Sequence, residues 1–342
     1  MLRLAIIGLG GAGTRQARAA AGLKEKFRIA ALCDLQLQRA CSMAKELGLP
    51  EKRCSANYED LLGDPQVEAI SIATPTFLHR EMAVAALAAG KHVLVESPPA
   101  LSMEEIDAMA AAERASGAVA MVAESDRYAF GARKALERIK EGRLGAVHLF
   151  EARSLVAVKN SPVPPWLLDP DQAGGGMWMA DGVRYLSLAR MLAGEIRAIR
   201  CRRVRPADAP TSAVDTVIAE FSFAGGAAGM ILTSYELAAR IYPNGWSVYG
   251  TAGAMFSRRN EPGRLTEFSY DESAKPIEHA APPAPGPPET DGTGPMLAHF
   301  ADSIALGYTP QTALGLERET MRAALAGTES MEKDEEVALE PR

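Results

Sequence analysis

Three glycines close to the start of the chain, Gly8, Gly10 and Gly13, have the spacing G-x-G-x-x-G. They follow an apolar run at residues 2–7 and precede a helix-like stretch, which is the order strand, glycine turn, helix. In such a turn the first glycine permits the tight bend, the second lets a pyrophosphate approach the backbone, and the third lets the helix pack closely on the strand. The amino end of the helix offers N–H groups and a positive dipole end to phosphates. The spacing therefore predicts a dinucleotide-binding turn; the alternative is a glycine-rich turn that binds nothing.

An acidic residue stands where a dinucleotide site needs one for the ribose. Asp34 ends a second apolar run, residues 28–33, and lies about 20 residues after Gly13. A carboxylate here accepts hydrogen bonds from the adenosine ribose hydroxyls and repels a 2′-phosphate. We therefore expect NAD as the cofactor, in preference to NADP. The expected cofactor contacts in this unit are Gly8, Leu9, Gly10, Gly11, Ala12, Gly13 and Asp34.

Length and composition indicate a globular protein with room for two domains. The 342 residues carry a formal net charge of −6 without a Lys/Arg cluster, so we expect no nucleic-acid partner. No apolar run reaches about 18 residues, and the first residues lack the pattern of a secretory signal, so we expect no membrane span and no export. The four cysteines form no C-x-x-C pair, and no two of the five histidines have helical metal-ligand spacing. These features predict reduced thiols, a cytoplasmic location and no metal site.

The pattern of elements changes along the chain. Residues 1–122 alternate strands and helices, which predicts an α/β domain: a Rossmann fold with a doubly wound parallel sheet and right-handed crossovers. Residues 123–342 predict a second, α+β domain with an open, mainly antiparallel sheet, interrupted by a helix near 177–192. Its C-terminal helices, near 295–306 and 312–326, could pack back on the first domain. The expected strands of the second sheet are residues 146–157, 196–205, 213–223, 227–235, 245–250 and 264–270.

Several further stretches resemble one enzyme family. They are the T-P-x-x-x-H motif at residues 74–79, the run at 86–96 that leads into an E-K-P motif, the segment 139–145, and Trp166 with the glycine triplet 174–176. Over nearly its whole length the chain resembles the glucose-fructose oxidoreductase / inositol dehydrogenase family (Gfo/Idh/MocA).

That resemblance implies hydride transfer between NAD(P) and a secondary alcohol of a sugar, a cyclitol or a related hydroxy compound. It implies a substrate site in the cleft between the two domains, with a small polyhydroxylated or carboxylated substrate. It also implies homodimers or homotetramers formed through the second sheet. To the expected cofactor contacts it adds Thr74, Pro75, His79 and Glu96.

The family's usual proton-transfer residues are replaced in this chain. Members commonly use the Lys of E-K-P, with an Asp and a His in the spacing G-G-G-x-x-x-D-x-G-x-H. The corresponding residues here are Ser97, Ala180 and Arg184. A serine hydroxyl without a neighbouring base is a poor proton acceptor at pH 7, and an arginine is always protonated. The usual acid/base set is therefore absent.

Two explanations remain open. In the first, the chain is a dehydrogenase or reductase with a rearranged site, in which Arg184 stabilises oxyanion charge or binds a substrate carboxylate. Asp181, Tyr185, His79 or Lys159 would then move the proton. Asp181 lies one residue beyond the family's position, a turn of about 100° on a helix, so it would need a distorted helix start to reach a substrate. The expected catalytic residues are Ser97, Asp181, Arg184 and Tyr185.

In the second explanation, hydride transfer to an alcohol is no longer the reaction. The chain would then be a redox-neutral lyase or hydrolase that uses NAD, or a catalytically silent protein that binds a nucleotide or a sugar.

Overall fold

The computed structural model describes residues 1–157, 163–205, 215–235, 244–261, 263–271, 275–282 and 291–339. The chain divides into two compact units. Unit 1 consists of Met1–Glu124 and Thr293–Arg318, and unit 2 consists of Ser125–Gly292 and Glu319–Arg342. The segment 293–318 therefore folds with the first unit, although it follows the second unit in the sequence.

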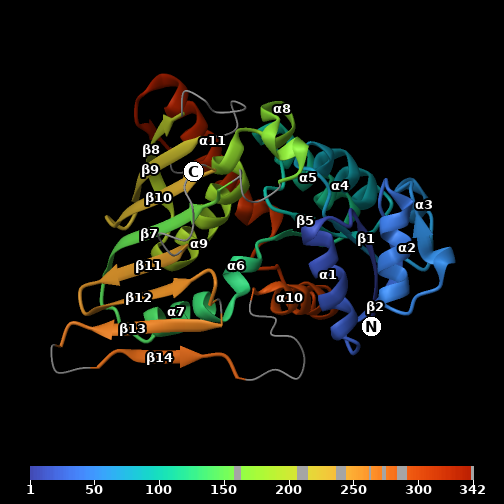
Figure 1. The fold of residues 1–342 in the computed structure, drawn as a ribbon, viewed down its shortest axis with the longest axis horizontal. Coiled ribbons are helices and arrows are strands. Elements are labelled where there is room, and N and C mark those ends of the chain that lie inside the picture. Colours follow the sequence, from blue (N-terminus) through green and yellow to red (C-terminus); the bar gives the residue numbers. More distant parts are fainter. Residues whose placement is uncertain are drawn as a thin grey trace. The chain divides into compact units, whose positions relative to one another are not determined.

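Within its described residues, unit 1 is built on a six-stranded parallel sheet in the order β3-β2-β1-β4-β5-β6 (Figure 1). Helices cover both faces of its central strands, so these strands are mostly buried and mostly apolar, with Ser71 of β4 as a buried polar exception. The strands are β1 (Leu2–Ile7), β2 (Phe27–Cys33), β3 (Cys54–Ser55), β4 (Ala69–Ile72), β5 (His92–Glu96) and β6 (Ala120–Ala123). This sheet confirms the doubly wound parallel fold predicted for the first domain.

Helix α5 of unit 1 begins and ends where the sequence provides caps. At α5 the Ser102 hydroxyl accepts a hydrogen bond from the Glu105 amide at 3.2 Å, and Gly117 ends the helix in the left-handed conformation. The helices are α1 (Gly11–Gly22), α2 (Leu37–Glu46), α3 (Glu59–Leu62), α4 (His79–Ala88), α5 (Met103–Ser116) and α10 (Thr293–Leu306), with short 3₁₀ turns at η1 (Glu51–Arg53) and η2 (Thr76–Leu78).

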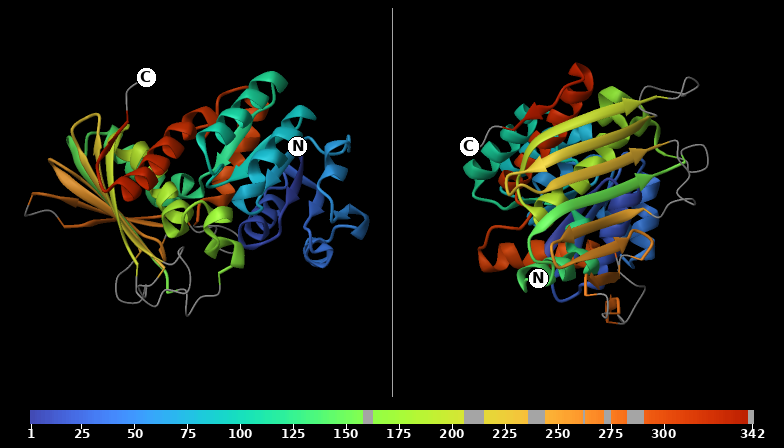
Figure 2. Two further views of the ribbon diagram at one scale, coloured as in Figure 1. Left: turned by 90° about the horizontal axis from the view of Figure 1, so that it is seen from above. Right: turned by 90° about the vertical axis from the view of Figure 1, so that its left-hand side faces the viewer.

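Unit 2 contains a broad sheet, nine-stranded within the described residues, in the order β14-β13-β12-β11-β7-β10-β9-β8-β15 (Figure 2). Its pairs are antiparallel except for β7 with β10. This confirms the mainly antiparallel second sheet. The strands are β7 (Val147–Leu155), β8 (Ile196–Val204), β9 (Thr216–Phe223), β10 (Ala228–Ser234), β11 (Gly245–Gly250), β12 (Gly253–Arg258), β13 (Arg264–Ser269), β14 (Ile277–Ala280) and β15 (Val337–Ala338).

One face of this sheet is covered and the other is not. Along β9 the inward residues Val217, Ala219 and Phe221 are buried, whereas Ile218 and Glu220 between them are exposed. The helical elements of unit 2 are α6 (Ser125–Tyr128), α7 (Phe130–Lys140), η4 (Pro165–Leu168), α8 (Pro170–Ala173), a π-helical turn η5 (Trp178–Gly182) and α9 (Val183–Ala193). Helix α11 (Leu314–Lys333) begins in unit 1 and ends in unit 2.

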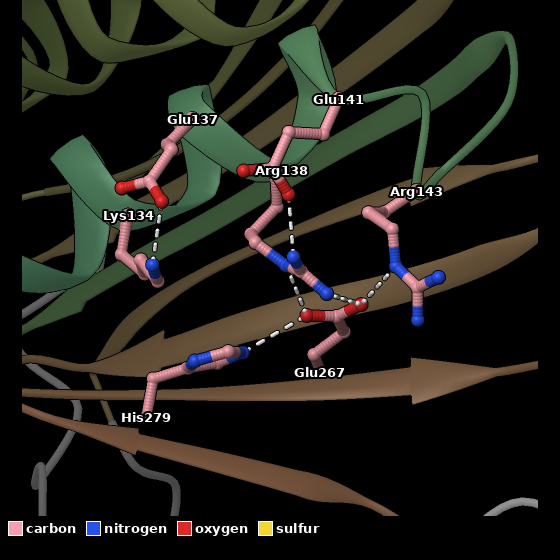
Figure 3. A network of polar contacts seen from close by, with 7 residues as sticks. All are labelled: Lys134, Glu137, Arg138, Glu141, Arg143, Glu267 and His279. Atoms are coloured by element: carbon pink, nitrogen blue, oxygen red, sulfur yellow. Dashed lines mark hydrogen bonds and ion pairs between the residues drawn. The ribbon is translucent and has the colours of Figure 1, made fainter.

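The buried Glu267 carboxylate joins α7 to β13, the strand next to the edge strand β14, through ion pairs (Figure 3). Glu267 on β13 accepts from Arg138 Nε at 2.8 Å and from Arg143 Nε at 3.3 Å, and His279 Nε2 lies 2.9 Å from its Oε2. Burial alone would raise the pKa of the Glu267 carboxyl, but the hydrogen bonds from Arg138 and His279 lower that pKa to about 2. The carboxylate is therefore ionised over the working pH range, and its role is structural.

Candidate functional site

The glycine turn of unit 1 has the contacts that a dinucleotide site needs. Gly8 has a φ of +84°, and a Cβ on Gly13 would lie 1.8 Å from the Gly8 carbonyl oxygen. These two glycines are required by the packing of the turn itself. At Gly10, in contrast, a Cβ would meet no atom within 4 Å. The fold leaves open space at Gly10, which fits close approach by a pyrophosphate at the start of α1.

The Asp34 carboxylate is held beside this turn by two backbone amides. Leu9 N donates to Oδ2 at 2.7 Å and Gln36 N donates to Oδ1 at 2.8 Å. An ionised carboxylate has about four acceptor positions, so these two bonds leave it able to accept from ribose hydroxyls. The open space at Gly10 and the oriented carboxylate together fit NAD.

His79 links the two loops that follow β4 and β5. Its Nε2 lies 2.9 Å from the Thr74 carbonyl oxygen and its Nδ1 lies 3.0 Å from that of Pro98. The side chain is buried, and burial lowers its pKa to about 4, so the ring is neutral at pH 7. A neutral ring has one N–H, so His79 donates to one of these carbonyl oxygens and lies against the other, between the Thr74–Pro75 loop and the Ser97–Pro98 loop, whose peptide bond is cis. Both ring nitrogens face backbone carbonyls, so moving a substrate proton is not a role that this geometry favours.

Glu96, the last residue of β5, is fixed by a glutamine on α1. Gln16 Nε2 donates to Glu96 Oε2 at 2.6 Å, and the Ser71 hydroxyl of β4 donates to Gln16 Oε1. This hydrogen-bonded chain runs from β4 through α1 to the carboxyl end of β5. It holds the backbone next to Ser97 at the edge of the sheet where ligands bind in doubly wound folds.

Ser97 has a neighbouring base, which sequence reasoning did not find. Its hydroxyl donates to Glu124 Oε1 at 2.5 Å, and Glu124 is 1% exposed. The register explains the contact: β5 and β6 are parallel neighbours in which Glu96 faces Ala123. The next residue of each strand therefore leaves the sheet beside the other. The signal available in the sequence was an acid directly after a buried strand.

In unit 2 a π-helical turn replaces a regular start of α9. The turn spans Trp178–Gly182, and the Trp178 ring fills the space beside Gly182, where a Cβ would lie 2.5 Å from the ring. The Trp178 indole N–H donates to the Ala324 carbonyl oxygen at 2.9 Å, and the side chain is fully buried. The sequence indicated that Asp181 would need a distorted helix start. The turn contains Asp181 and is a distortion of that kind.

The Asp181 carboxylate is surrounded by arginines. Arg259 Nη1 donates to Oδ2 at 2.8 Å, Arg184 Nη1 lies 3.4 Å from Oδ1, and the Ser154 hydroxyl also donates to Oδ2. Burial alone would raise the pKa of Asp181, but the positive charges of Arg259 and Arg184 lower it to about 2. Asp181 is thus ionised at working pH and orients two guanidinium groups, and it is a poor acceptor of a substrate proton.

Two further predicted catalytic residues lie beside Asp181. Arg184 also pairs with Asp126, whose Oδ2 lies 2.9 Å from Nη2. The Tyr185 hydroxyl donates to the Arg153 carbonyl oxygen at 3.0 Å, and burial raises the pKa of this phenol. Lys159, the remaining proton-transfer candidate, lies outside the described residues.

The predicted site residues therefore fall into two groups. The cofactor residues and Ser97 gather at the carboxyl edge of the sheet in unit 1, while Asp181, Arg184 and Tyr185 gather on and beside the π-helical turn in unit 2. Sequence reasoning missed Glu124, Arg259 and Ser154. Arg259 and Ser154 lie far from Asp181 in the sequence, so only the folded sheet brings them to it. In the part of the chain that the structure describes, no cluster of His, Cys, Asp or Glu could hold a metal ion, and no helix is long and apolar enough to cross a membrane.

Comparison with known proteins identifies both units. Residues 2–124 match the family model described as "Oxidoreductase family, NAD-binding Rossmann fold", and residues 132–256 match the GFO/IDH/MocA C-terminal domain. The 1,5-anhydro-D-fructose reductase of Ensifer adhaerens is 27% identical over 85% of this chain and 91% of its own length. The myo-inositol 2-dehydrogenase of Thermotoga maritima is 26% identical over 75% of each chain.

A solved structure shows the same fold. Levoglucosan dehydrogenase in complex with NADH and levoglucosan superposes with a TM-score of 0.87 at 24% identity, covering 98% of this chain and 99% of the other. At this identity the likeness supports the architecture of the chain, and not its substrate.

Proposed function

This chain belongs to the Gfo/Idh/MocA family of NAD-dependent oxidoreductases, and we propose that it transfers hydride between nicotinamide and the hydroxyl-bearing carbon of a sugar, a cyclitol or a related hydroxy compound. The observation that carries the proposal is the glycine turn with its oriented acid, in which Gly10 faces open space and Asp34 is aligned by Leu9 N. The named relatives act on anhydro-sugars and inositol, which supports the substrate class.

Each part of the cofactor has a proposed set of residues. The pyrophosphate would lie against Gly10 and the first N–H groups of α1, which begins at Gly11. The adenosine ribose would be bound by Asp34 and the glycine turn, and the Thr74–Pro75 and Glu96–Ser97 loops would border the nicotinamide ribose. When bound, NAD supplies an acceptor for hydride from the substrate carbon.

The test is a substrate panel with purified protein and NAD. Polyols, sugars and sugar acids are offered one by one, and NADH formation is followed with NAD affinity measured in parallel. We expect NADH formation with at least one member of the panel. Silence across the panel with NAD still bound would contradict the proposal and favour a redox-neutral lyase or hydrolase, or a silent binding protein. Replacement of the usual Lys, Asp and His by Ser97, Ala180 and Arg184 keeps that second class open.

We also propose that the protein forms a homodimer or homotetramer through the uncovered face of the unit 2 sheet. On that face Ile218 of β9 lies opposite Leu232 of β10, and Met230 lies beside them on the same strand. Ile218 and Phe268, also on this face, are 37% and 39% exposed. Apolar strand residues left uncovered in this way favour burial against a second copy.

The oligomer is tested by light scattering on the double variant Ile218→Glu, Leu232→Glu. Two buried charges should dissociate it to monomers. The control is Leu35→Glu, at a position in unit 1 that is 90% exposed. A wild-type protein that is already monomeric would contradict the proposal.

The proposed location is the cytoplasm. All four cysteines are free thiols, and Cys33 and Cys201 are buried in the two units. Reduced thiols of this kind fit a reducing compartment. Recovery of the protein mainly outside the cytoplasm after cell fractionation would contradict this.

A further inference from the structure

We propose that Ser97 and Glu124 form a proton relay, in which Ser97 exchanges a proton with the reacting hydroxyl and Glu124 holds that proton through Ser97. This inference rests on the proposed function, because it supplies the proton step for that reaction. Ser97 is the group expected to touch substrate. Glu124 acts through it and is a positioning residue in this sense.

Ser97 and Glu124 directly follow the carboxyl ends of two neighbouring strands. β5 and β6 are adjacent parallel strands, and Glu96 and Ala123 are register partners at their carboxyl ends. Ser97 and Glu124 therefore emerge side by side at the edge of the sheet where a doubly wound fold binds its ligands. The loop that carries Ser97 is tied by His79 to the loop after β4.

In the hydrogen bond between them, Ser97 is the donor and Glu124 the acceptor. An ionised carboxylate only accepts, so the 2.5 Å contact places the Ser97 proton on the side of Glu124 Oε1. The lone pairs of Ser97 Oγ are then directed away from Glu124 and can accept a proton from another hydroxyl. A serine with a carboxylate behind it is thus activated by the logic that pairs a hydroxyl with an adjacent base.

Asp181, Tyr185 and His79 do not offer such a path. Asp181 is held ionised by two guanidinium groups, which cannot release a proton at working pH. Tyr185 donates its hydroxyl to a backbone carbonyl, and both nitrogens of His79 face carbonyl oxygens. Among the described candidates, Ser97 with Glu124 joins a hydroxyl that can exchange a proton to a group that can store it.

The proton and the hydride leave the substrate by separate routes. In alcohol oxidation the substrate O–H bond breaks and its proton binds Ser97 Oγ, while the Ser97 proton passes to Glu124 Oε1. The hydrogen on the carbinol carbon leaves with its two electrons for the nicotinamide, and the carbon–oxygen double bond forms. Reduction reverses each transfer, with Glu124 supplying the proton through Ser97.

The first test needs neither substrate nor cofactor. Infrared spectra of the apo protein are recorded during acidification, and the Glu124 carboxyl band is identified as the band missing in Glu124→Gln. We expect Ser97→Ala to shift both the frequency and the midpoint of that band, because it removes the hydrogen bond. A band that does not respond to Ser97→Ala would refute coupling between the two groups.

The second test uses the substrate found in the panel. We expect Glu124→Gln and Ser97→Ala to lower kcat by on the order of 10²-fold to 10³-fold while NAD affinity changes less than about twofold. Added formate should partly restore Glu124→Ala, a recovery that a purely structural role would not give. Glu113→Gln is the matched control: that carboxylate accepts from Ala120 N beside β6 at 2.8 Å, and its change should leave kcat near wild type.

The outcomes separate the two proposals. A wild type that is active on the panel, together with a Glu124→Gln variant of full kcat, would refute the relay alone. A wild type that is silent on the panel would refute the proposed function, and with it the role of the relay in that reaction.

Discussion

Two carboxylates of this chain, Glu124 in unit 1 and Asp181 in unit 2, each accept a hydrogen bond from a serine hydroxyl, and Asp181 also lies between two guanidinium groups. Asp181 accepts from the guanidinium of Arg259 and from a serine, and its pKa falls to about 2. Glu124 accepts from the hydroxyl of Ser97, a group that can give up one proton and take another. The guanidinium groups hold Asp181 ionised at working pH despite its serine neighbour, whereas the Ser97 hydroxyl offers a route for a proton to Glu124. We therefore expect Asp181, the acid nearest to the family's position, to hold charge in place, and Glu124 to take part in proton transfer.

We expect the largest loss of stability from removing the negative charge of Asp181. Asp181→Asn leaves Arg259 and Arg184 without their shared negative charge. Because the Asp181 side chain is 13% exposed and that of Arg259 is 40% exposed, we expect the free energy of unfolding to fall by about 2–3 kcal/mol, below the range for a fully buried pair. Urea denaturation checks this. An unchanged midpoint would show that the arginines do not depend on Asp181.

Acid should weaken the same cluster in the wild type. The folded-state pKa of Asp181 is about 2, below its ordinary value of 3.8, so its contribution is present above about pH 4 and is lost as pH falls towards 2. The loss attributable to Asp181 should reach about 2 kcal/mol, measured as the wild-type change minus that of Asp181→Asn. Glu267, whose pKa is also lowered to about 2, titrates in both proteins and cancels in that difference. Parallel pH curves for the two proteins would contradict the prediction.

A third carboxylate, Asp34, is held by backbone amides, since Leu9 N and Gln36 N both donate to it. We expect Asp34→Arg with Leu35→Ser to weaken NAD binding by about tenfold, or about 1.4 kcal/mol, and to strengthen NADP binding, since the charge facing the ribose is reversed. Isothermal titration calorimetry with both cofactors measures this, with Leu35→Ser alone as the control. Unchanged NAD affinity in the double variant would remove Asp34 from the ribose site.

We also expect a modest effect on stability when the Ser97–Glu124 hydrogen bond is removed. Ser97→Ala removes one hydrogen bond to a buried carboxylate and leaves its packing in place, so the free energy of unfolding should fall by about 1–2 kcal/mol. For Ser97→Ala we therefore expect a large loss of kcat with a modest loss of stability, whereas for Asp181→Asn we expect the larger loss of stability. A Ser97→Ala protein that unfolds much more easily than Asp181→Asn would show that the pair is mainly structural.

Local patterns predicted much of this molecule. The parallel sheet followed from repeated strand-helix units, and the cap of α5 from Ser102 and Glu105 at fixed spacing. Strand β12 was missed because its two faces do not differ in polarity: Phe256 is on the uncovered face, and Ser257 is on the buried one. The Ser97–Glu124 contact could not be predicted from local spacing, because it depends on the register between β5 and β6. Two of the partners of Asp181, Ser154 on β7 and Arg259 directly after β12, are distant in the sequence, and only the folded sheet brings them to it.

The most direct test of the central claim is the pH dependence of kcat for alcohol oxidation, measured together for wild type, Glu124→Gln and Asp181→Asn. We expect wild-type kcat to fall on the acid side as Glu124 takes up a proton, because the relay then has no acceptor. Asp181→Asn should keep that acid limb at the same midpoint, whereas Glu124→Gln should be slow and lose it. An acid limb that survives in Glu124→Gln and disappears in Asp181→Asn would contradict the account.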